Sequence, residues 1–179
     1  MSDLRSHSSE TPVVILEPER LVDIHGWCLM HNHYHLLLNE RVEGGLVKFL
    51  RKLNIGYAKY FNERYKRSGT LFQGRTKKLL IDSDAYFLHI LNYIHLNPLD
   101  TLSETENWRE RSIEKCDVAL EHLKNYRWSS YLDYSGVKNF PSILAKDLFD
   151  DVFNGDYARQ LDTYIRDLGP GEISHLKLE

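Results

Sequence analysis

Two apolar stretches separated by a two-residue turn constrain the fold of this chain most. Leu21–Met30 is apolar enough for a buried strand, and His33–Asn39 has the pattern of a returning strand. His31-Asn32 lies between them, and asparagine tolerates the left-handed backbone that tight turns require. The sequence therefore predicts a β-hairpin, and with it an antiparallel sheet.

A strong helical pattern follows the hairpin. Apolar side chains recur there at helical spacing and form one face: Leu46, Phe49, Leu50, Leu53, Tyr57, Tyr60 and Phe61. Further along, Lys77–Ile81 predicts a short strand. Residues 82–84 then supply a capping signal for a helix that runs to Leu96 and is stopped by Pro98.

The last third of the chain is more polar. Residues 100–112 are charged and are expected to form a linker or a long loop, whereas Ile113–Leu123 has a helical pattern. Two more short helices are expected within residues 142–168. This mixture of a hairpin and helices predicts an α+β fold, an antiparallel sheet with helices on one side.

Bulk properties exclude several classes of protein. No apolar run approaches the roughly 20 residues that cross a membrane, and the N-terminus lacks the apolar core of a secretory signal. The cytoplasm is therefore the expected location. Cys28 and Cys116 lie far apart without a partner motif, so we expect free thiols rather than a disulfide framework.

Positive charge is concentrated in one part of an acidic protein. Residues 48–78 hold ten Lys and Arg and a single acid, so this stretch carries +9, while the whole chain carries −3. Such a block indicates a surface that binds a polyanion. A solvated helix surface is the plain alternative, but Tyr57, Tyr60, Tyr65 and Phe72 lie among the charges, and aromatic rings among cations suit stacking on unpaired bases.

His33 and His35 are the first candidates for chemistry. Residues two apart on a strand point to the same side, so their imidazoles could share one divalent cation. His31 has the same parity but falls at the predicted turn. For a His-x-His pair taken alone, two histidines hydrogen-bonded on a sheet surface are the more common outcome.

Tyr93 and Asn97 are the second candidates, four residues apart on one face of the predicted helix. A tyrosine hydroxyl can attack a phosphodiester and form a covalent phosphotyrosine. With a pKa near about 10, it needs a polarised phosphate or a nearby base. Taken alone, Tyr93 and Ile94 are more commonly helix-core residues. Tyr86, on the same helix, lacks the following asparagine.

Four motifs resemble, in the same order, the motifs of the single-tyrosine HUH transposases. These are the transposases of the insertion-sequence-200-like type. The resemblance covers about residues 20–136. Its segments are the His-x-His strand at residues 27–38, a glycine-rich loop at 68–75, the nucleophile helix with its motifs at 82–86 and 93–98, and a motif at 126–131 typical of the branch associated with repetitive extragenic palindromes (REP). The conjunction of motifs outweighs the plain alternatives for each motif taken alone.

This resemblance implies a fold and an activity. The fold would be a ferredoxin-like antiparallel sheet with helices packed on it, followed by a C-terminal helical extension. The activity would be metal-dependent cutting and strand transfer of single-stranded or hairpin DNA, in which Tyr93 forms a 5′-phosphotyrosine and frees a 3′-hydroxyl. His33, His35 and Asn97 would bind Mg²⁺ or Mn²⁺, and this donor set suits Mn²⁺ better than Ca²⁺.

The resemblance also implies partners. The DNA would be single-stranded or hairpin DNA, such as palindromic repeats, and the protein would act as a monomer or a homodimer, with the tyrosine used in cis or in trans. Candidate contacts to the DNA backbone are Lys48, Arg51, Lys52, Lys59, Arg75, Lys77 and Lys78.

The chain also departs from the family. Relatives begin with a strand and a long helix, whereas about twenty residues precede Leu21 here, so either Thr11–Leu16 replaces that strand or the copy is truncated. A truncated copy could bind DNA without cutting it. His31 stands where relatives have proline, and residues 100–124 form an insertion without assigned chemistry. We expect three parts: a poorly ordered or remodelled N-terminus at 1–19, a catalytic core at 20–99, and a linker with helical extension at 100–179.

Overall fold

The predicted hairpin is the centre of the fold. The computed structural model describes residues 19–110 and 112–167, in which β1 (Val22–Leu29) pairs antiparallel with β2 (Tyr34–Glu40). The register places Cys28 opposite His35, and the backbone N–H of Met30 donates to the carbonyl of His33 at 2.8 Å to close the turn. The expected strand Thr11–Leu16, and the N-terminal segment around it, lie outside the described residues.

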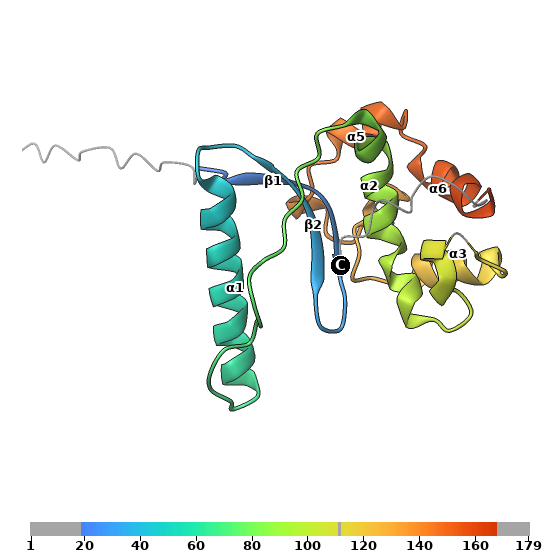
Figure 1. Ribbon diagram of the computed structural model, residues 1–179. Coiled ribbons are helices and arrows are strands. Elements are labelled where there is room, and N and C mark those ends of the chain that lie inside the picture. The colour runs from blue at the N-terminus through green and yellow to red at the C-terminus, as the bar shows by residue number, and fades with distance from the viewer. Residues whose placement is uncertain (1–18, 111, 168–179) are drawn as a thin grey trace, which may run out of the picture.

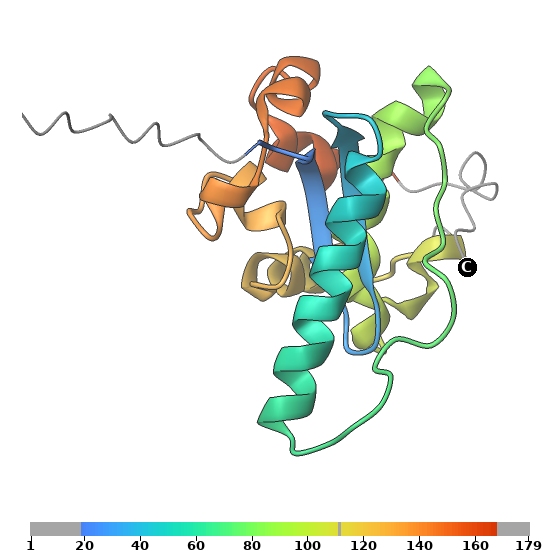
Figure 2. The ribbon, with the colours of Figure 1, turned by 90° about the vertical axis from the view of Figure 1, so that its left-hand side faces the viewer.

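Helices cover both faces of the hairpin, whereas the sequence suggested only one. Figures 1 and 2 show α1 (Gly45–Arg64) on one side of the two strands and α2 (Asp84–Leu96) on the other. Side chains alternate along β2. The hydroxyl of Tyr34 therefore donates to Asn54 of α1 at 2.6 Å, while the ring of His35 faces Tyr93 of α2. The predicted α+β class, helices packed on an antiparallel sheet, is confirmed.

At Gly26, a side chain of α2 packs directly on the backbone of β1. A Cβ atom added to Gly26 would lie 2.7 Å from Cδ1 of Leu91 on α2, too close for two carbon atoms. The predicted start of α2 is confirmed, because the hydroxyl of Ser83 accepts from the backbone N–H of Tyr86 at 3.4 Å. Pro98 ends the α-helix as expected, and a 3₁₀ turn, η1 (Asn97–Thr101), continues from it.

Helix α1 is held at its beginning and is largely open along its length. The carboxylate of Glu40 accepts hydrogen bonds from the backbone N–H groups of Gly44 and Leu46, at 2.9 and 3.0 Å, so the end of β2 caps α1. The predicted apolar face exists, but much of it is uncovered: Tyr57 is 48% exposed and Tyr60 is 61% exposed.

The predicted strand Lys77–Ile81 is wrong. Residues 65–83 form an irregular segment that returns from the far end of α1 to the start of α2 (Figure 1), and no residue of it belongs to a strand or bridge. Leu79 and Leu80 are both exposed, so the apolar side chains of this segment do not alternate onto one face as a sheet requires.

The C-terminal part packs on the same core as the hairpin. Trp108, Leu120, Phe149 and Leu161 are buried in one cluster with Leu91 of α2, so the expected linker or loop is packed on the core at Trp108. None of the described helices is long and apolar enough to cross a membrane. The remaining elements are η2 (Glu106–Glu110), α3 (Cys116–Asn125), α4 (Tyr131–Tyr134), η3 (Pro141–Ile143), α5 (Asp147–Val152) and α6 (Tyr157–Arg166).

Candidate active site

His33 and His35 lie together at the turn end of β2. Their Nε2 atoms are 3.1 Å apart, and their rings meet nearly edge to face. Nδ1 of His33 lies 2.7 Å from Oδ1 of Asn32, an acceptor, so a neutral His33 carries its proton on Nδ1 and its lone pair on Nε2. The Nε2 of His33 then accepts from the Nε2 of His35, and the same lone pair could serve a cation instead.

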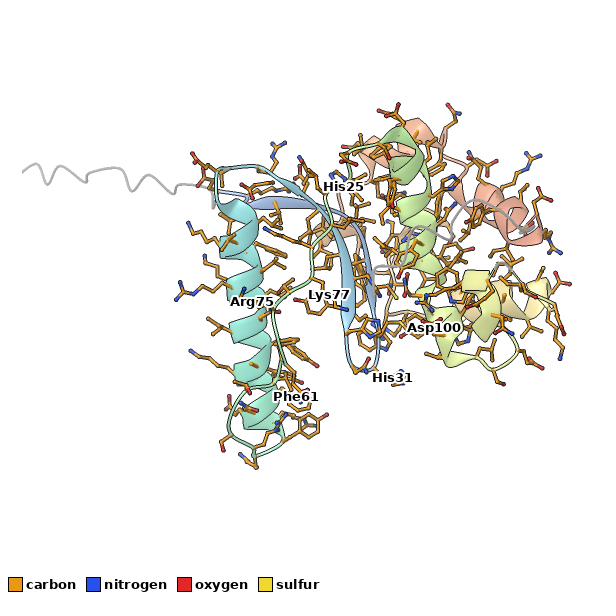
Figure 3. All side chains as sticks on the ribbon, viewed as in Figure 1. His25, His31, Phe61, Arg75, Lys77 and Asp100 are labelled. Carbon is orange, nitrogen blue, oxygen red and sulfur yellow. The ribbon has the colours of Figure 1, made fainter. Side chains whose placement is uncertain are left out.

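The spacing of these nitrogens fits a shared cation. Imidazole nitrogens bind divalent metals at about 2.1 Å, which places neighbouring ligands of one ion about 3 Å apart. His31 lies at the exposed tip of the hairpin (Figure 3), where it extends the turn. Among the described residues, no group of three or more His, Cys, Asp or Glu side chains could hold a metal. Among those residues, a third ligand would therefore have to be of another type.

Tyr93 lies beside this pair but is covered. Its ring centre is 5.8 Å from that of His35, with the planes perpendicular, and 5.7 Å from the ring of Trp108. Only 5% of Tyr93 is exposed. The structure thus brings together the two histidines and the tyrosine, with the tyrosine buried.

Asn97 does not turn its amide toward solvent. It is fully buried, its Nδ2 donates to the backbone carbonyl of Tyr93 at 2.7 Å, and its Oδ1 accepts from the Nη2 of Arg109 at 3.0 Å. The oxygen that was expected to ligate a cation is therefore bound by a guanidinium group.

Arg109 is the residue of this site that the sequence did not reveal. Its guanidinium lies 5.9 Å from the ring centre of Tyr93 and 4.5 Å from that of Trp108, and it forms an ion pair with Asp100. Burial lowers the pKa of Arg109, but the hydrogen bond and the charge of Asp100, with the hydrogen bond to Tyr93, outweigh it and raise the pKa. Arg109 is thus a permanent positive charge beside the candidate nucleophile.

The segment that carries Arg109 is firmly anchored. The hydroxyl of buried Thr105 donates to the carbonyl of Leu99 at 3.0 Å, and the Nε1 of Trp108 donates to Asp100 at 2.6 Å. Figure 3 shows Asp100 just past the end of α2, at the start of this segment. No spacing rule would have linked Arg109 to Asn97, because the contact depends on how residues 97–110 fold back on α2.

The basic residues proposed to bind DNA are all exposed. Four project from α1 and three lie on the segment that returns from α1 toward α2, where Figure 3 shows Arg75 and Lys77. Within the described part of the chain, no carboxylate pairs with any of them. They are Lys48, Arg51, Lys52, Lys59, Arg75, Lys77 and Lys78.

The motif at residues 126–131 has a structural role. Its backbone runs along the edge of β1: the N–H of Leu29 donates to the carbonyl of Trp128 at 2.8 Å, and the N–H of Ser130 donates to that of Trp27 at 2.9 Å. The Oγ of Ser130 also lies 2.7 Å from the Nε2 of buried His95. This motif joins β1 to α2 and contributes no group to the candidate site.

Comparison with known families agrees with this geometry. Residues 13–97 match the family model described as "Transposase IS200 like". The match contains both histidines, Tyr93 and Asn97, and it ends before Arg109. No curated protein and no solved structure matches the chain.

The matched stretch thus contains an antiparallel hairpin with a histidine pair that lies beside a tyrosine of α2. Residues 13–97, just under half of the chain, are similar to the IS200-like transposase family. DNA is the partner that similarity to a transposase family implies.

Proposed function

We propose that this protein is a metal-dependent endonuclease and strand transferase for single-stranded or hairpin DNA, with Tyr93 as its nucleophile. One observation carries the proposal: facing imidazole nitrogens of His33 and His35, 3.1 Å apart, lie next to the ring of Tyr93. These three residues come from different elements, β2 with its turn and α2. If α2 packed on β2 for stability alone, it would not need a tyrosine beside the two imidazoles.

In the proposed reaction the phenol oxygen of Tyr93 attacks a DNA phosphorus. A bond forms between that oxygen and phosphorus, and the bond between phosphorus and the 3′-oxygen breaks. The phenol proton passes to water, and the departing oxygen takes up a proton to become a free 3′-hydroxyl. The 5′-phosphate stays on the tyrosine, so the ester bond energy is retained and the reaction can be reversed on a new strand.

His33 and His35 would hold Mg²⁺ or Mn²⁺, with Asn97 as a third ligand once its oxygen is released by Arg109. When bound, such a cation polarises a phosphate and favours in-line attack. Because Tyr93 and His35 meet within one chain, the geometry supports use of the tyrosine in cis. The cytoplasm is the proposed place of action.

DNA binding is assigned to the exposed basic residues of α1 and of residues 75–78. The rings of Tyr57 and Phe72 are 6.1 Å apart, and Tyr57, Tyr60 and Tyr65 are exposed among these cations. Rings of this kind stack on unpaired bases, while the cations bind the phosphates. The motif at 126–131 remains the basis for assigning the chain to the REP-associated branch.

A DNA-binding protein that keeps the scaffold without cutting is the second candidate. Burial of Tyr93 and the bond between Arg109 and Asn97 favour it, because a strand has no access to the phenol in this conformation. The two candidates make opposite predictions about covalent attachment.

The test is an adduct assay with labelled oligonucleotides that carry a hairpin and a single-stranded flank. With Mn²⁺, the wild-type chain is expected to yield a product that resists SDS, whereas Tyr93→Phe binds the DNA but yields none. Tyr86→Phe, two helical turns earlier on α2, is the matched control and keeps the activity. If the wild type binds the oligonucleotide but never forms the adduct, the second candidate is correct.

A further inference from the structure

The contact between Arg109 and Asn97 has a consequence for metal binding. Asn97 offers one side-chain oxygen, and Arg109 already donates to it at 3.0 Å. The amide nitrogen donates to the carbonyl of Tyr93 at 2.7 Å. The amide is therefore held in one orientation, and its oxygen can serve the guanidinium or a cation.

Several contacts keep Arg109 in place. Its side chain is only 27% exposed, it pairs with Asp100, and it stacks on Trp108. Asp100 is itself fixed by the Nε1 of Trp108 at 2.6 Å. A charge held in this way occupies its acceptor far better than a mobile surface arginine does.

We propose that Arg109 sets the cation affinity of the site by competing with the metal for the Oδ1 of Asn97. This inference rests on the proposed function, because it takes Asn97 as a ligand together with His33 and His35. It adds a residue outside the stretch of the chain that matches the family, and it gives residues 97–110 a chemical role.

The competition also couples the metal to the nucleophile. Trp108 and Arg109 both lie against the ring of Tyr93, which is 5% exposed. A cation that takes the oxygen of Asn97 removes one interaction that holds Arg109 over this ring. This coupling is reciprocal. A change that weakens the bond of Arg109 to Asn97 therefore strengthens cation binding by the same free energy.

The experiment measures Mn²⁺ affinity by calorimetry on the full chain without DNA. Arg109→Gln is expected to tighten Mn²⁺ binding at least about tenfold, since a hydrogen bond to a charged group no longer has to be exchanged. Arg109→Lys keeps the charge but loses the planar fork, so its affinity for Mn²⁺ should lie between those of the wild type and Arg109→Gln. Cooperative urea unfolding of each variant shows that it is folded.

The Asn97→Ala background separates competition from simple charge repulsion. Removing a positive charge would raise cation affinity in any background, whereas relief of competition requires the oxygen of Asn97. We therefore expect Arg109→Gln to change the affinity little when Asn97 is alanine. An equal gain in both backgrounds, or no gain in either, overturns the inference.

His33→Ala tells which proposal has failed. Loss of Mn²⁺ binding in His33→Ala, together with unchanged affinity in Arg109→Gln, leaves the proposed metal site in place and overturns the competition alone. Equal binding by His33→Ala and the wild type overturns the metal site, and the competition with it.

Discussion

His95 is a buried residue that joins three helices by hydrogen bonds. It is 0% exposed on α2, its Nδ1 lies 2.8 Å from the hydroxyl of Tyr157 on α6, and its Nε2 lies 2.7 Å from the Oγ of Ser130 just before α4. Burial lowers the pKa of His95 from 6.5 to about 3. The folded protein thus keeps this imidazole neutral.

That lowered pKa predicts a pH dependence of stability. The unfolded chain takes up a proton on His95 below about pH 6.5, and the folded chain does so only near pH 3. The unfolded state then holds more protons, so the free energy of unfolding falls as pH decreases, by up to about 1.4 kcal/mol per pH unit from this residue.

Urea unfolding between pH 7 and 5 measures this effect, above the range in which most carboxylates titrate. His95→Gln is the control, because it keeps hydrogen-bonding groups but cannot take the proton. It should be less stable than the wild type at pH 7 and lose less stability as the pH falls. Identical slopes for the two proteins would contradict the assignment.

Among the elements, the contact of α2 with β1 depends on Gly26. Gly26→Ala would force its Cβ against Leu91, 2.7 Å from Cδ1, and should destabilise the fold by about 1–3 kcal/mol. Gly56→Ala is the matched control, since nothing lies within 4 Å of its added Cβ, and a helical alanine there should stabilise by up to about 1 kcal/mol.

Urea unfolding of both glycine variants provides the measurement. A loss of stability at residue 26 would show that the buried side chain of Leu91 cannot move aside without cost. An unchanged stability of Gly26→Ala would show that α2 can shift at no cost.

The exposed cations of α1 predict the salt dependence of DNA binding. Changing Lys48, Lys52 and Lys59 to alanine should weaken binding of a single-stranded oligonucleotide. The slope of log affinity against log salt concentration should become shallower by about 0.7 for each phosphate that is no longer neutralised. Lys124 and Lys138 are also exposed but lie outside the basic stretch, so their alanine variants serve as controls. Equal slopes for wild type and the triple variant would identify the charges as a solvated surface.

Patterns within a few residues predicted the elements well, and long-range packing decided the rest. The hairpin, α1 and the capped start of α2 follow from alternation, helical spacing and Ser83. The expected strand at residues 77–81 failed, since a strand needs a neighbouring edge as well as its own pattern.

The same distinction applies to the candidate site. His33 with His35, and Tyr93 with Asn97, are local pairs whose spacing alone suggested a shared face. Arg109 reaches Asn97 only because residues 97–110 fold back on α2. Burial of Tyr93 under Trp108 has the same origin, and no local pattern carries that information.

At the scale of the whole molecule, one buried cluster joins α2 to the C-terminal helices within residues 19–110 and 112–167. Leu91 and Ile94 of α2 are buried in the same cluster as Phe149, Tyr157 and Leu161. Leu161→Ala in α6 should therefore destabilise the hairpin as well, by about 2–5 kcal/mol. Urea unfolding is monitored by circular dichroism and by tryptophan fluorescence. The two probes should give coincident transitions in the wild type and in Leu161→Ala. Separate transitions would show that residues 100–167 fold on their own.

The chemical identity of the protein–DNA link tests the role of Tyr93 as nucleophile most directly. After reaction with Mn²⁺ and a hairpin oligonucleotide, the adduct is trimmed with nuclease, and the modified peptide is located by mass spectrometry. The expected product is a nucleotide joined through its 5′-phosphate to Tyr93, absent from Tyr93→Phe and retained in Tyr86→Phe. Attachment at another residue, or no attachment on a DNA that the protein binds, would contradict it.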